Sequence, residues 1–425
     1  MSLEPGKGGP VRQAYVASQV VIDVKAIKQL VLPVSQGLAM LDLDSFGDPF
    51  TNQGGISAPV LSGDGEHVAW FYDGDHGSIH GQYGFAWRDL LTGATIDHPG
   101  VTTYGIDMST DGRFVAYPEA SIVAKNGYVE AMAVWLWDSQ TGQLTAINRK
   151  TPNNKADDGD TESVSVAADG RFVVFASTSQ SLAPVGESLC TPFVTPDCNE
   201  TAGYVYLYDR LSGSLLAVPP QAMFGQQPAL SDPVVSGNGE AVAFHDGLDT
   251  DVWYPQSGVV RRLDEDDFPC LTDARSLALS SDGSTLADNC AGSAGVVKLG
   301  GPTGPDTVEW TYTFPNPDGW NNSVALSDNG STMALFGSSG PAGWGLWPIW
   351  RVELPSGEMS LLTAPGQIPG LHSEELQSGM AEDQVTISAS GDQIAAVACS
   401  IQQAAGDSQS CPLREDVFRW TAPGA

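Results

Sequence analysis

Short apolar runs separated by polar turns recur along the whole chain, and one phrase returns seven times. In its clearest copy, VAADGRFVVFAS at 166–177, an apolar run meets an Asp-Gly pair and a second apolar run follows. Asp-Gly and Asn-Gly tolerate the positive φ angles of a tight hairpin turn, and so they fix the register of the flanking strands. A sequence unit that recurs with insertions of variable length between its copies is typical of a fold built from structural repeats. The copies lie at 61–72, 108–119, 166–177, 235–246, 279–290, 326–337 and 387–398.

Within each copy, large and small apolar residues alternate in the second run. Three residues after the glycine comes an aliphatic residue or methionine, then a small residue, and then usually a large one, as in Val173, Val174 and Phe175. Successive side chains of a strand point to opposite faces, so both faces of this strand are apolar. Such a strand fits between two neighbouring sheets and not on a face exposed to water.

A second motif follows most copies and reads as a strand, a turn containing glycine, and another strand. Together the two motifs give four antiparallel strands per unit, and helical periodicity is nearly absent. Seven such units predict an all-β fold, a seven-bladed β-propeller. The second motif lies at 85–96, 134–147, 205–218, 252–263 and 349–362.

The last unit lacks an outer strand, because the chain ends shortly after Trp420. The stretch VSQGLAMLDLD at 34–44 has the same form as the outer strand of the sixth unit, PSGEMSLL. We therefore predict that Leu38–Leu43, with 29–34 as a further candidate, completes the seventh blade and closes the ring. The predicted organisation is an N-terminal arm with the closing strand at 1–55 and one propeller at 56–425.

The phrase Ser-x-Asp-Gly-Arg-Phe-Val-x-Phe resembles the WD40-like (PD40) repeat of TolB-type propellers, and the third copy with YVYLYDRLSGSL fits best. The resemblance covers roughly residues 55–420 and implies a bacterial envelope or secreted protein. This propeller type serves adaptors, lectin-like modules, peptidase accessory domains and a few lyases, so it implies no single function. The fifth unit departs from the pattern, with Asp288 at an aromatic position and a weak third strand at 295–299.

The chain is strongly acidic, with 51 Asp and Glu against 19 Lys and Arg and a net charge of −32. This balance disfavours nucleic acid and anionic membrane surfaces as partners. It fits a highly soluble protein, a cation-binding face or a basic partner. No stretch is long enough to span a bilayer. We expect a secreted or periplasmic bacterial protein whose leader is absent from this sequence, and a cytoplasmic location stays open.

Six cysteines predict disulfides and an oxidising compartment. Their positions relative to the predicted strands favour pairing in sequential order. Zinc binding is less favoured because no Cys-x-x-Cys pair exists, and free buried thiols are the remaining alternative. The cysteines are Cys190, Cys198, Cys270, Cys290, Cys399 and Cys411.

Two connecting segments carry candidate metal ligands. Ca²⁺ prefers several carboxylate and carbonyl oxygens on flexible backbone, so the acidic stretch NNKADDGDTES at 153–163 is a candidate calcium site, although its spacing is not that of an EF-hand. LDEDDF at 263–268 is a weaker candidate of the same kind. FYDGDHGSIHGQYG at 71–84 is a candidate transition-metal site. Exposed polar loops are the alternative for all three. The candidate ligands are Asp157, Asp158, Asp160 and Glu162 for calcium, and Asp75, His76 and His80 for a transition metal.

A third candidate is aromatic and belongs to the sixth unit, in the segments 313–323 and 337–350. Tryptophans beside polar side chains can stack on a sugar ring or anchor a peptide. The alternative is that they cap the end of the blade against solvent. The residues are Trp320, Trp344 and Trp347, with Asp318, Asn321 and Asn322 beside them.

Sequence motifs of catalysis are mostly missing, including the nucleophile elbow, HExxH, the P-loop and the dinucleotide fingerprint. The sequence thus favours a non-catalytic recognition or scaffold propeller that binds a protein or neutral glycan on its loop-rich face, with Ca²⁺ as the one candidate cofactor. One alternative is a metal-dependent polysaccharide lyase or hydrolase with its site at the central channel. Another is a structural subunit of a cell-envelope assembly, which would show a large apolar patch.

Overall fold

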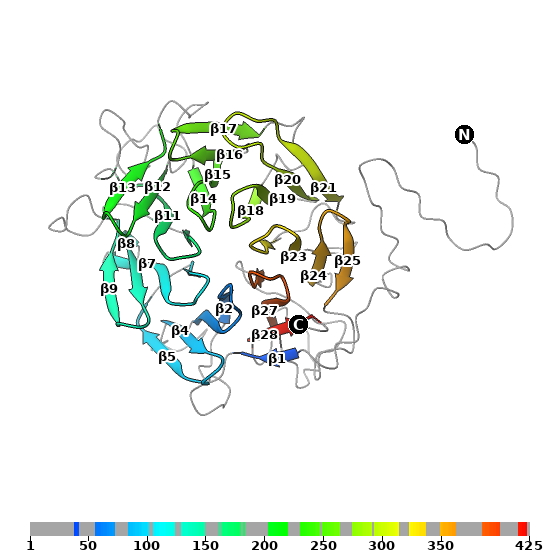
Figure 1. Ribbon diagram of the computed structural model, residues 1–425. Coiled ribbons are helices and arrows are strands. Elements are labelled where there is room, and N and C mark those ends of the chain that lie inside the picture. The colour runs from blue at the N-terminus through cyan, green and yellow to red at the C-terminus, as the bar shows by residue number, and fades with distance from the viewer. Residues whose placement is uncertain are drawn as a thin grey trace, which may run out of the picture.

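The structure is a seven-bladed β-propeller, seen along its central axis in the computed structural model (Figure 1). The described residues form seven four-stranded antiparallel sheets and contain no helix, which confirms the predicted fold. They are 38–41, 56–72, 84–101, 105–123, 129–148, 161, 163–179, 182, 203–219, 230–246, 249–263, 274–290, 293–313, 323–336, 349–362, 385–399 and 415–422.

Each blade is built from strands consecutive in sequence, except the last, and the first strand of each blade lies innermost. Blade 1 comprises β2 (Ile56–Leu61), β3 (His67–Tyr72), β4 (Gly84–Asp89) and β5 (Thr95–Pro99). Blade 2 comprises β6 (Asp107–Met108), β7 (Phe114–Val123), β8 (Val129–Asp138) and β9 (Gln143–Ala146). Blade 3 comprises β10 (Val164–Val166), β11 (Phe172–Ser177), β12 (Tyr204–Asp209) and β13 (Ser214–Ala217).

The remaining blades follow the same plan. Blade 4 comprises β14 (Leu230–Val235), β15 (Val242–Asp246), β16 (Asp249–Tyr254) and β17 (Val259–Leu263). Blade 5 comprises β18 (Ala274–Leu279), β19 (Thr285–Cys290), β20 (Ser293–Lys298) and β21 (Thr307–Thr313). Blade 6 comprises β22 (Ser323–Leu326), β23 (Thr332–Phe336), β24 (Ile349–Glu353) and β25 (Glu358–Leu361). Blade 7 comprises β26 (Val385–Ile387), β27 (Gln393–Cys399), β28 (Glu415–Thr421) and β1 (Leu38–Met40).

The apolar core lies between the blades, as the alternation of large and small residues predicts. Trp70, Phe175 and Phe244 on the second strands have no exposed surface or almost none. Phe175 and Phe244, from successive blades, belong to one buried cluster. We call the contact between two adjacent blades a seam, because each seam is a separate sheet-on-sheet core.

The recurring phrase forms the hairpin turn between the first two strands of each blade. In blade 2 the Ser109 hydroxyl donates a hydrogen bond to Asp111 (2.6 Å) and accepts one from the N–H of Phe114 (2.9 Å). Corresponding pairs of bonds occur in blades 1, 4, 5 and 6. The recurring serine and the aspartate or asparagine after it therefore stabilise the turn. This structural role accounts for their recurrence, and no catalytic role is needed to explain it.

Backbone hydrogen bonds between successive turns form a closed ring around the axis. Each turn donates an N–H to a carbonyl of the next turn, and the bond from Ala389 to Gly63 (2.7 Å) joins blade 7 to blade 1. The other bonds run from Asp64 to Thr110 (2.9 Å), Thr110 to Ala168 (2.9 Å), Ala168 to Gly237 (3.1 Å), Asn238 to Ser281 (2.8 Å), Ser281 to Asp328 (2.7 Å) and Asp328 to Ala389 (3.0 Å). We call this set of bonds the turn ring.

The turn glycines also lie against the preceding blade. Gly170 has φ of 67°, and a Cβ placed on it would come within 2.2 Å of the Phe114 ring. The same approach occurs between Gly112 and His67, and between Gly239 and Phe172. In each case the covering residue lies two positions after the turn glycine of the preceding blade. The repeat thus keeps glycine for close packing between blades as well as for the turn.

The N-terminal strand closes the ring, as predicted. β1 pairs antiparallel with β28, with Leu38 opposite Trp420 and Met40 opposite Phe418. The N–H of Leu41 continues the ladder to the carbonyl of Val417 (2.8 Å), and its side chain is buried. The described strand ends at Met40, so it is shorter than the predicted 38–43, and 29–34 lie outside the described residues.

Deletion of residues 1–45 is expected to lower the melting temperature by roughly 5 °C, because it removes the closing strand and leaves β28 as an open edge. The open edge should also promote association, which size-exclusion chromatography would detect. Deletion of residues 1–30 retains β1 and is the control. Equal melting temperatures for the two truncated proteins would contradict closure by β1.

Candidate functional site

The site residues predicted from the sequence lie outside the described part of the chain, so their roles stay predictions. For the cysteines only the backbone of Cys290 and Cys399 is described, at the ends of β19 and β27 as expected. The predicted site residues concerned are Asp75, His76, His80, Asp157, Asp158, Asp160, Glu162, Asp318, Trp320, Asn321, Asn322, Trp344 and Trp347, together with Cys190, Cys198, Cys270 and Cys411.

The described strands nevertheless fix the face from which these segments leave. The segments 73–83, 149–160, 314–322 and 337–348 each join a second to a third strand, or an outer strand to the next blade. Because neighbouring strands are antiparallel, all these connections leave the sheets at the face opposite the hairpin turns of the repeat. We call the two ends of the propeller the loop face and the turn face.

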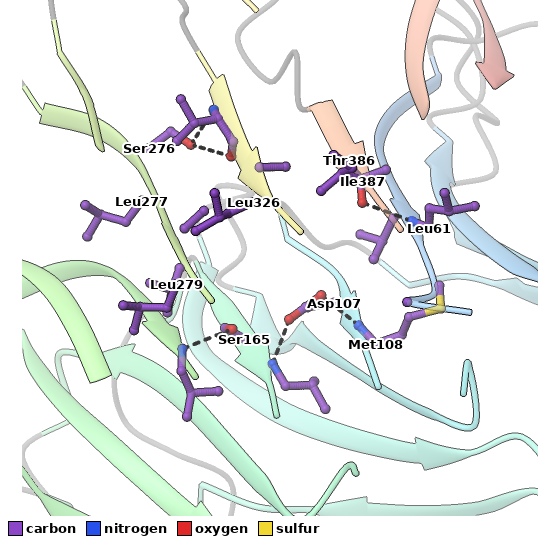
Figure 2. Close-up of a pocket in the computed structure, with 18 of the residues that line it drawn as sticks. Leu61, Asp107, Met108, Ser165, Ser276, Leu277, Leu279, Leu326, Thr386 and Ile387 are labelled. Atoms are coloured by element: carbon purple, nitrogen blue, oxygen red, sulfur yellow. Dashed lines mark hydrogen bonds between the residues drawn. The ribbon is translucent and has the colours of Figure 1, made fainter. Parts of the chain in front are cut away.

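A cavity of about 640 Å³ runs along the axis and is lined by the first strands of the blades and their turns (Figure 2). Much of its wall is aliphatic, including Leu61, Met108, Leu277 and Ile387. These four side chains belong to the buried clusters of the seams, so only a small part of each is exposed at the channel. Polar atoms nevertheless contribute more of the exposed surface of the channel than apolar atoms do.

Five polar side chains of the channel wall bind the backbone of the next blade. Each accepts a hydrogen bond from an N–H group on the neighbouring first strand, and four of these bonds are drawn in Figure 2. These N–H groups belong to sheet edges that would otherwise lack partners. The bonds run from Val166 to Asp107 (2.7 Å), Val235 to Ser165 (3.3 Å), Val324 to Ser276 (3.1 Å), Val385 to Ser323 (3.2 Å) and Leu61 to Thr386 (3.2 Å).

Sequence analysis missed these residues, although a signal exists. Asp107, Ser165 and Thr386 each lie five residues before the turn glycine of their blade. Ser276 and Ser323 lie seven residues before it, which is the same face of the strand. A polar residue at either position predicts an acceptor for an N–H group of the next blade.

The channel is acidic where the structure describes it. Asp107, Asp232 and Asp328 line it, and no Lys, Arg or His does. Burial raises the pKa of Asp107 to about 6, although it accepts hydrogen bonds from Val166, Met108 and Ser165, which lower the value. Burial also raises the pKa of Asp328. Cations are thus favoured over anions in this passage.

Ser165, Ser276 and Ser323 of the channel wall accept backbone hydrogen bonds, and no histidine is among the described residues of this wall. Among the described residues no cluster of His, Cys, Asp and Glu could hold a metal ion. The lyase alternative would need His and Arg around the channel, and the described wall contains neither.

Asp288, the exception to the repeat pattern, is completely buried in the seam between blades 4 and 5. One carboxylate oxygen accepts a hydrogen bond from the Thr250 hydroxyl (2.7 Å), and the other faces His245 (3.9 Å). Its strand is paired along its whole length with β20 (Ser293–Lys298), so the third strand that looked weak in sequence is regular. Asp288 belongs to a polar cluster and does not mark a broken blade.

Within the described residues no helix is long and apolar enough to cross a membrane. No protein-family model and no curated protein sequence matches the chain. The TolB-type resemblance therefore stays a prediction.

Solved structures match over nearly the whole chain. One is described as the structure of U3-55K, with a TM-score of 0.54, 13% identity and coverage of 92% of this chain and 100% of that one. Another is the β-propeller domain of Cps50 (Swd1) from Myceliophteria thermophila, with a TM-score of 0.52, 12% identity and coverage of 91% and 99%. At this identity the likeness concerns the fold alone. The protein is a seven-bladed β-propeller with a WD40-like fold.

Proposed function

We propose that this protein is a non-catalytic recognition or scaffold propeller that binds a protein or a neutral glycan on its loop face. The observation that supports this proposal is the unequal length of the connections on the two faces. On the turn face every hairpin is short, such as 62–66 between β2 and β3. On the loop face the connections include 178–203 between β11 and β12 and 362–384 between β25 and β26.

Long connections concentrated on one face are typical of binding surfaces carried by a rigid scaffold. The scaffold is rigid because the hydrogen bonds of the turn ring and of the channel wall connect each blade to the next. The residues of the connections on the loop face can therefore vary without a change of fold. The described channel supports the same proposal, because its polar groups bind backbone.

The charge narrows the class of partner. A net charge of −32 disfavours polyanions and favours a neutral glycan or a protein with basic groups. The tryptophans of blade 6 are the residues we assign to contact with that partner. Aromatic residues next to Asp318 and Asn321 combine an apolar stacking surface with hydrogen-bonding groups, as recognition of a sugar or peptide requires.

Substitution of Trp320, Trp344 and Trp347 together by alanine is expected to weaken binding at least tenfold, because buried aromatic anchors carry most of the energy at such interfaces. The probes are an array of neutral glycans and a library of lysine- and arginine-rich peptides, followed by calorimetry on the strongest ligand. The control is L91A/L211A, which removes two exposed leucines (72% and 68% exposed) from the turn face.

The control protein should bind like the wild type. Unchanged affinity in the triple variant would contradict the assignment to the tryptophans. Loss of affinity in the control alone would move the binding surface to the turn face.

A further inference from the structure

A single buried histidine connects three segments at the seam between blades 4 and 5. His245 lies on β15, and only 1% of its surface is exposed. Its Nδ1 lies 3.7 Å from an oxygen of Asp232 on β14, and its Nε2 lies 3.9 Å from an oxygen of Asp288 on β19. The imidazole therefore stands between two carboxylates, one from its own blade and one from the next.

The two carboxylates differ in their surroundings. Asp288 is fully buried, and the Thr250 hydroxyl fixes its orientation. Asp232 is about half exposed (49%) and belongs to the channel wall. Its backbone has φ of 48°, inside the register shift of β14 between Ser231 and Val234. His245 thus links a buried anchor in blade 5 to an irregular segment at the channel.

The equivalent positions in the other seams carry no ion pair, and the only amide among them is Asn289, between blades 5 and 6. The residue six positions after one turn glycine meets the residue five positions after the next, as Ala176 meets Phe244. Phe336 and Ala396 occupy the same positions between blades 6 and 7 and share a buried cluster. Only the seam between blades 4 and 5 places a histidine opposite an aspartate there. Because an apolar pair fills this space between blades 3 and 4 and between blades 6 and 7, the ionic pair is not needed for the fold.

We propose that His245 is a proton-operated latch, which in its protonated form holds the irregular segment of the channel wall at Asp232 against blade 5 and in its neutral form releases it. Protonated imidazole carries an N–H on each side and attracts both carboxylates. Neutral imidazole carries one N–H and no charge, so it faces one of the two carboxylates without a donor. Loss of one proton thus weakens both contacts at once.

The titration behaviour agrees with this geometry. Burial by itself lowers the pKa of His245, but the attraction of the Asp232 and Asp288 carboxylates outweighs it and raises the pKa to about 9. Burial raises the pKa of Asp288, against the effect of His245. Since the folded pKa of His245 lies above its unfolded value, the latch stabilises the protein fully below the unfolded pKa. That contribution is lost as the pH rises through 9.

The other charged side chains of blade 4 near this site form ion pairs with one another and not with His245. Among the described residues, those near the same ends of the strands are Asp246, Asp249, Asp251 and Arg262. Arg262 pairs with all three of these aspartates. On β16 the residue that faces the latch is Thr250, which carries no charge. The two carboxylates described above are therefore the charged partners of His245 in the described structure.

Hydrogen exchange of the full-length protein, corrected for the intrinsic rates at each pH, tests the latch. Peptides from 230–246 are expected to exchange at least tenfold faster at pH 10 than at pH 7, while peptides from 164–177 keep their protection. In H245Q the fast exchange of 230–246 should already be present at pH 7. In H245A/D288F, which copies the Ala176 and Phe244 pair of the preceding seam, the exchange should not depend on pH.

The matched control is H67Q, because His67 also lies 3.7 Å from an aspartate, Asp64, but on the turn face. It should keep the wild-type response. An NMR titration provides a second measurement, in which the His245 resonances should move near pH 9. Titration near the ordinary value of 6.5, or equal protection of 230–246 at pH 7 and pH 10, would overturn the proposal.

Discussion

Valine in place of Gly170 is expected to lower the free energy of unfolding by about 4 kcal/mol, the largest effect we expect from one substitution at the turns. The backbone there has φ of 67°, which costs a β-branched residue about 1–3 kcal/mol. The added Cβ would also come within 2.2 Å of the Phe114 ring, and overpacking of this kind costs about 1–3 kcal/mol. Denaturant unfolding measures the sum.

Gly213 separates the two contributions. Its φ is 69°, but a Cβ on it would meet no atom within 4 Å. G213V should therefore show the backbone cost alone, and the difference from G170V is the cost of crowding against blade 2. Combining G170V with F114A should recover part of that difference in a double-mutant cycle. Equal losses in G170V and G213V would show that the seam does not constrain the glycine.

Acidification from pH 9 to pH 5 is expected to raise the melting temperature. Burial raises the pKa of Asp107 and of Asp251 to about 6, in the latter case despite Arg262. A carboxyl group whose folded pKa is raised costs stability as the pH climbs from its unfolded value through 6. His245 contributes in the same direction between its unfolded value and about 9. Lower net charge at acid pH adds to the effect.

The gain should end near pH 4. Asp138 and Asp209 have pKa values lowered to about 2, first of all by hydrogen bonds from Arg113 and Arg171. Their contribution is present above the unfolded value and is lost as the pH falls towards 2. We therefore expect a maximum of stability near pH 5, measured by calorimetry in a series of buffers at constant ionic strength.

D107N is the variant that tests the acid part of this profile. It removes the charge but keeps an oxygen to accept the hydrogen bond from Val166. At pH 7 it should be more stable than the wild type by about 2 kcal/mol, somewhat less than a shift of two pKa units implies, because channel solvent screens the group. At pH 4 the two proteins should unfold alike. A wild-type melting temperature that falls steadily from pH 7 to pH 5 would refute the account.

The architecture could be derived from the sequence because its determinants are local. Each turn glycine, the serine before it and the alternation after it fall within about a dozen residues. The closing strand was also within reach, since the missing outer strand of the last unit has a counterpart at Leu38. Its end at Met40 was beyond reach, because pairing with β28 sets it.

The channel and the latch depend on contacts between residues that are far apart in the sequence. Ser165 occupies a recurrent polar position of the repeat, but only the structure shows that the N–H of Val235 in the next blade donates to it. Asp288 was visible as an exception, but its partner His245 lies in another repeat and reads as an ordinary polar residue. Which residues share a seam follows only from how the blades are placed around the ring.

The turn ring has a consequence for how this propeller can change over time. Its bonds use only backbone atoms, so different side chains are tolerated at the position two residues before each turn glycine. In six blades the residue at this position lines the mouth of the channel. Neighbouring positions are nevertheless coupled in size. A Cβ at Gly63 would lie 2.6 Å from the Thr110 methyl group, and one at Gly237 would lie 2.1 Å from the Ser281 hydroxyl. The rim should therefore evolve by paired exchanges, in which one residue shrinks before its neighbour grows. Engineered charged residues at these positions would likewise require the neighbouring residue to be made smaller first. The seven residues are Gly63, Thr110, Ala168, Gly237, Ser281, Asp328 and Ala389.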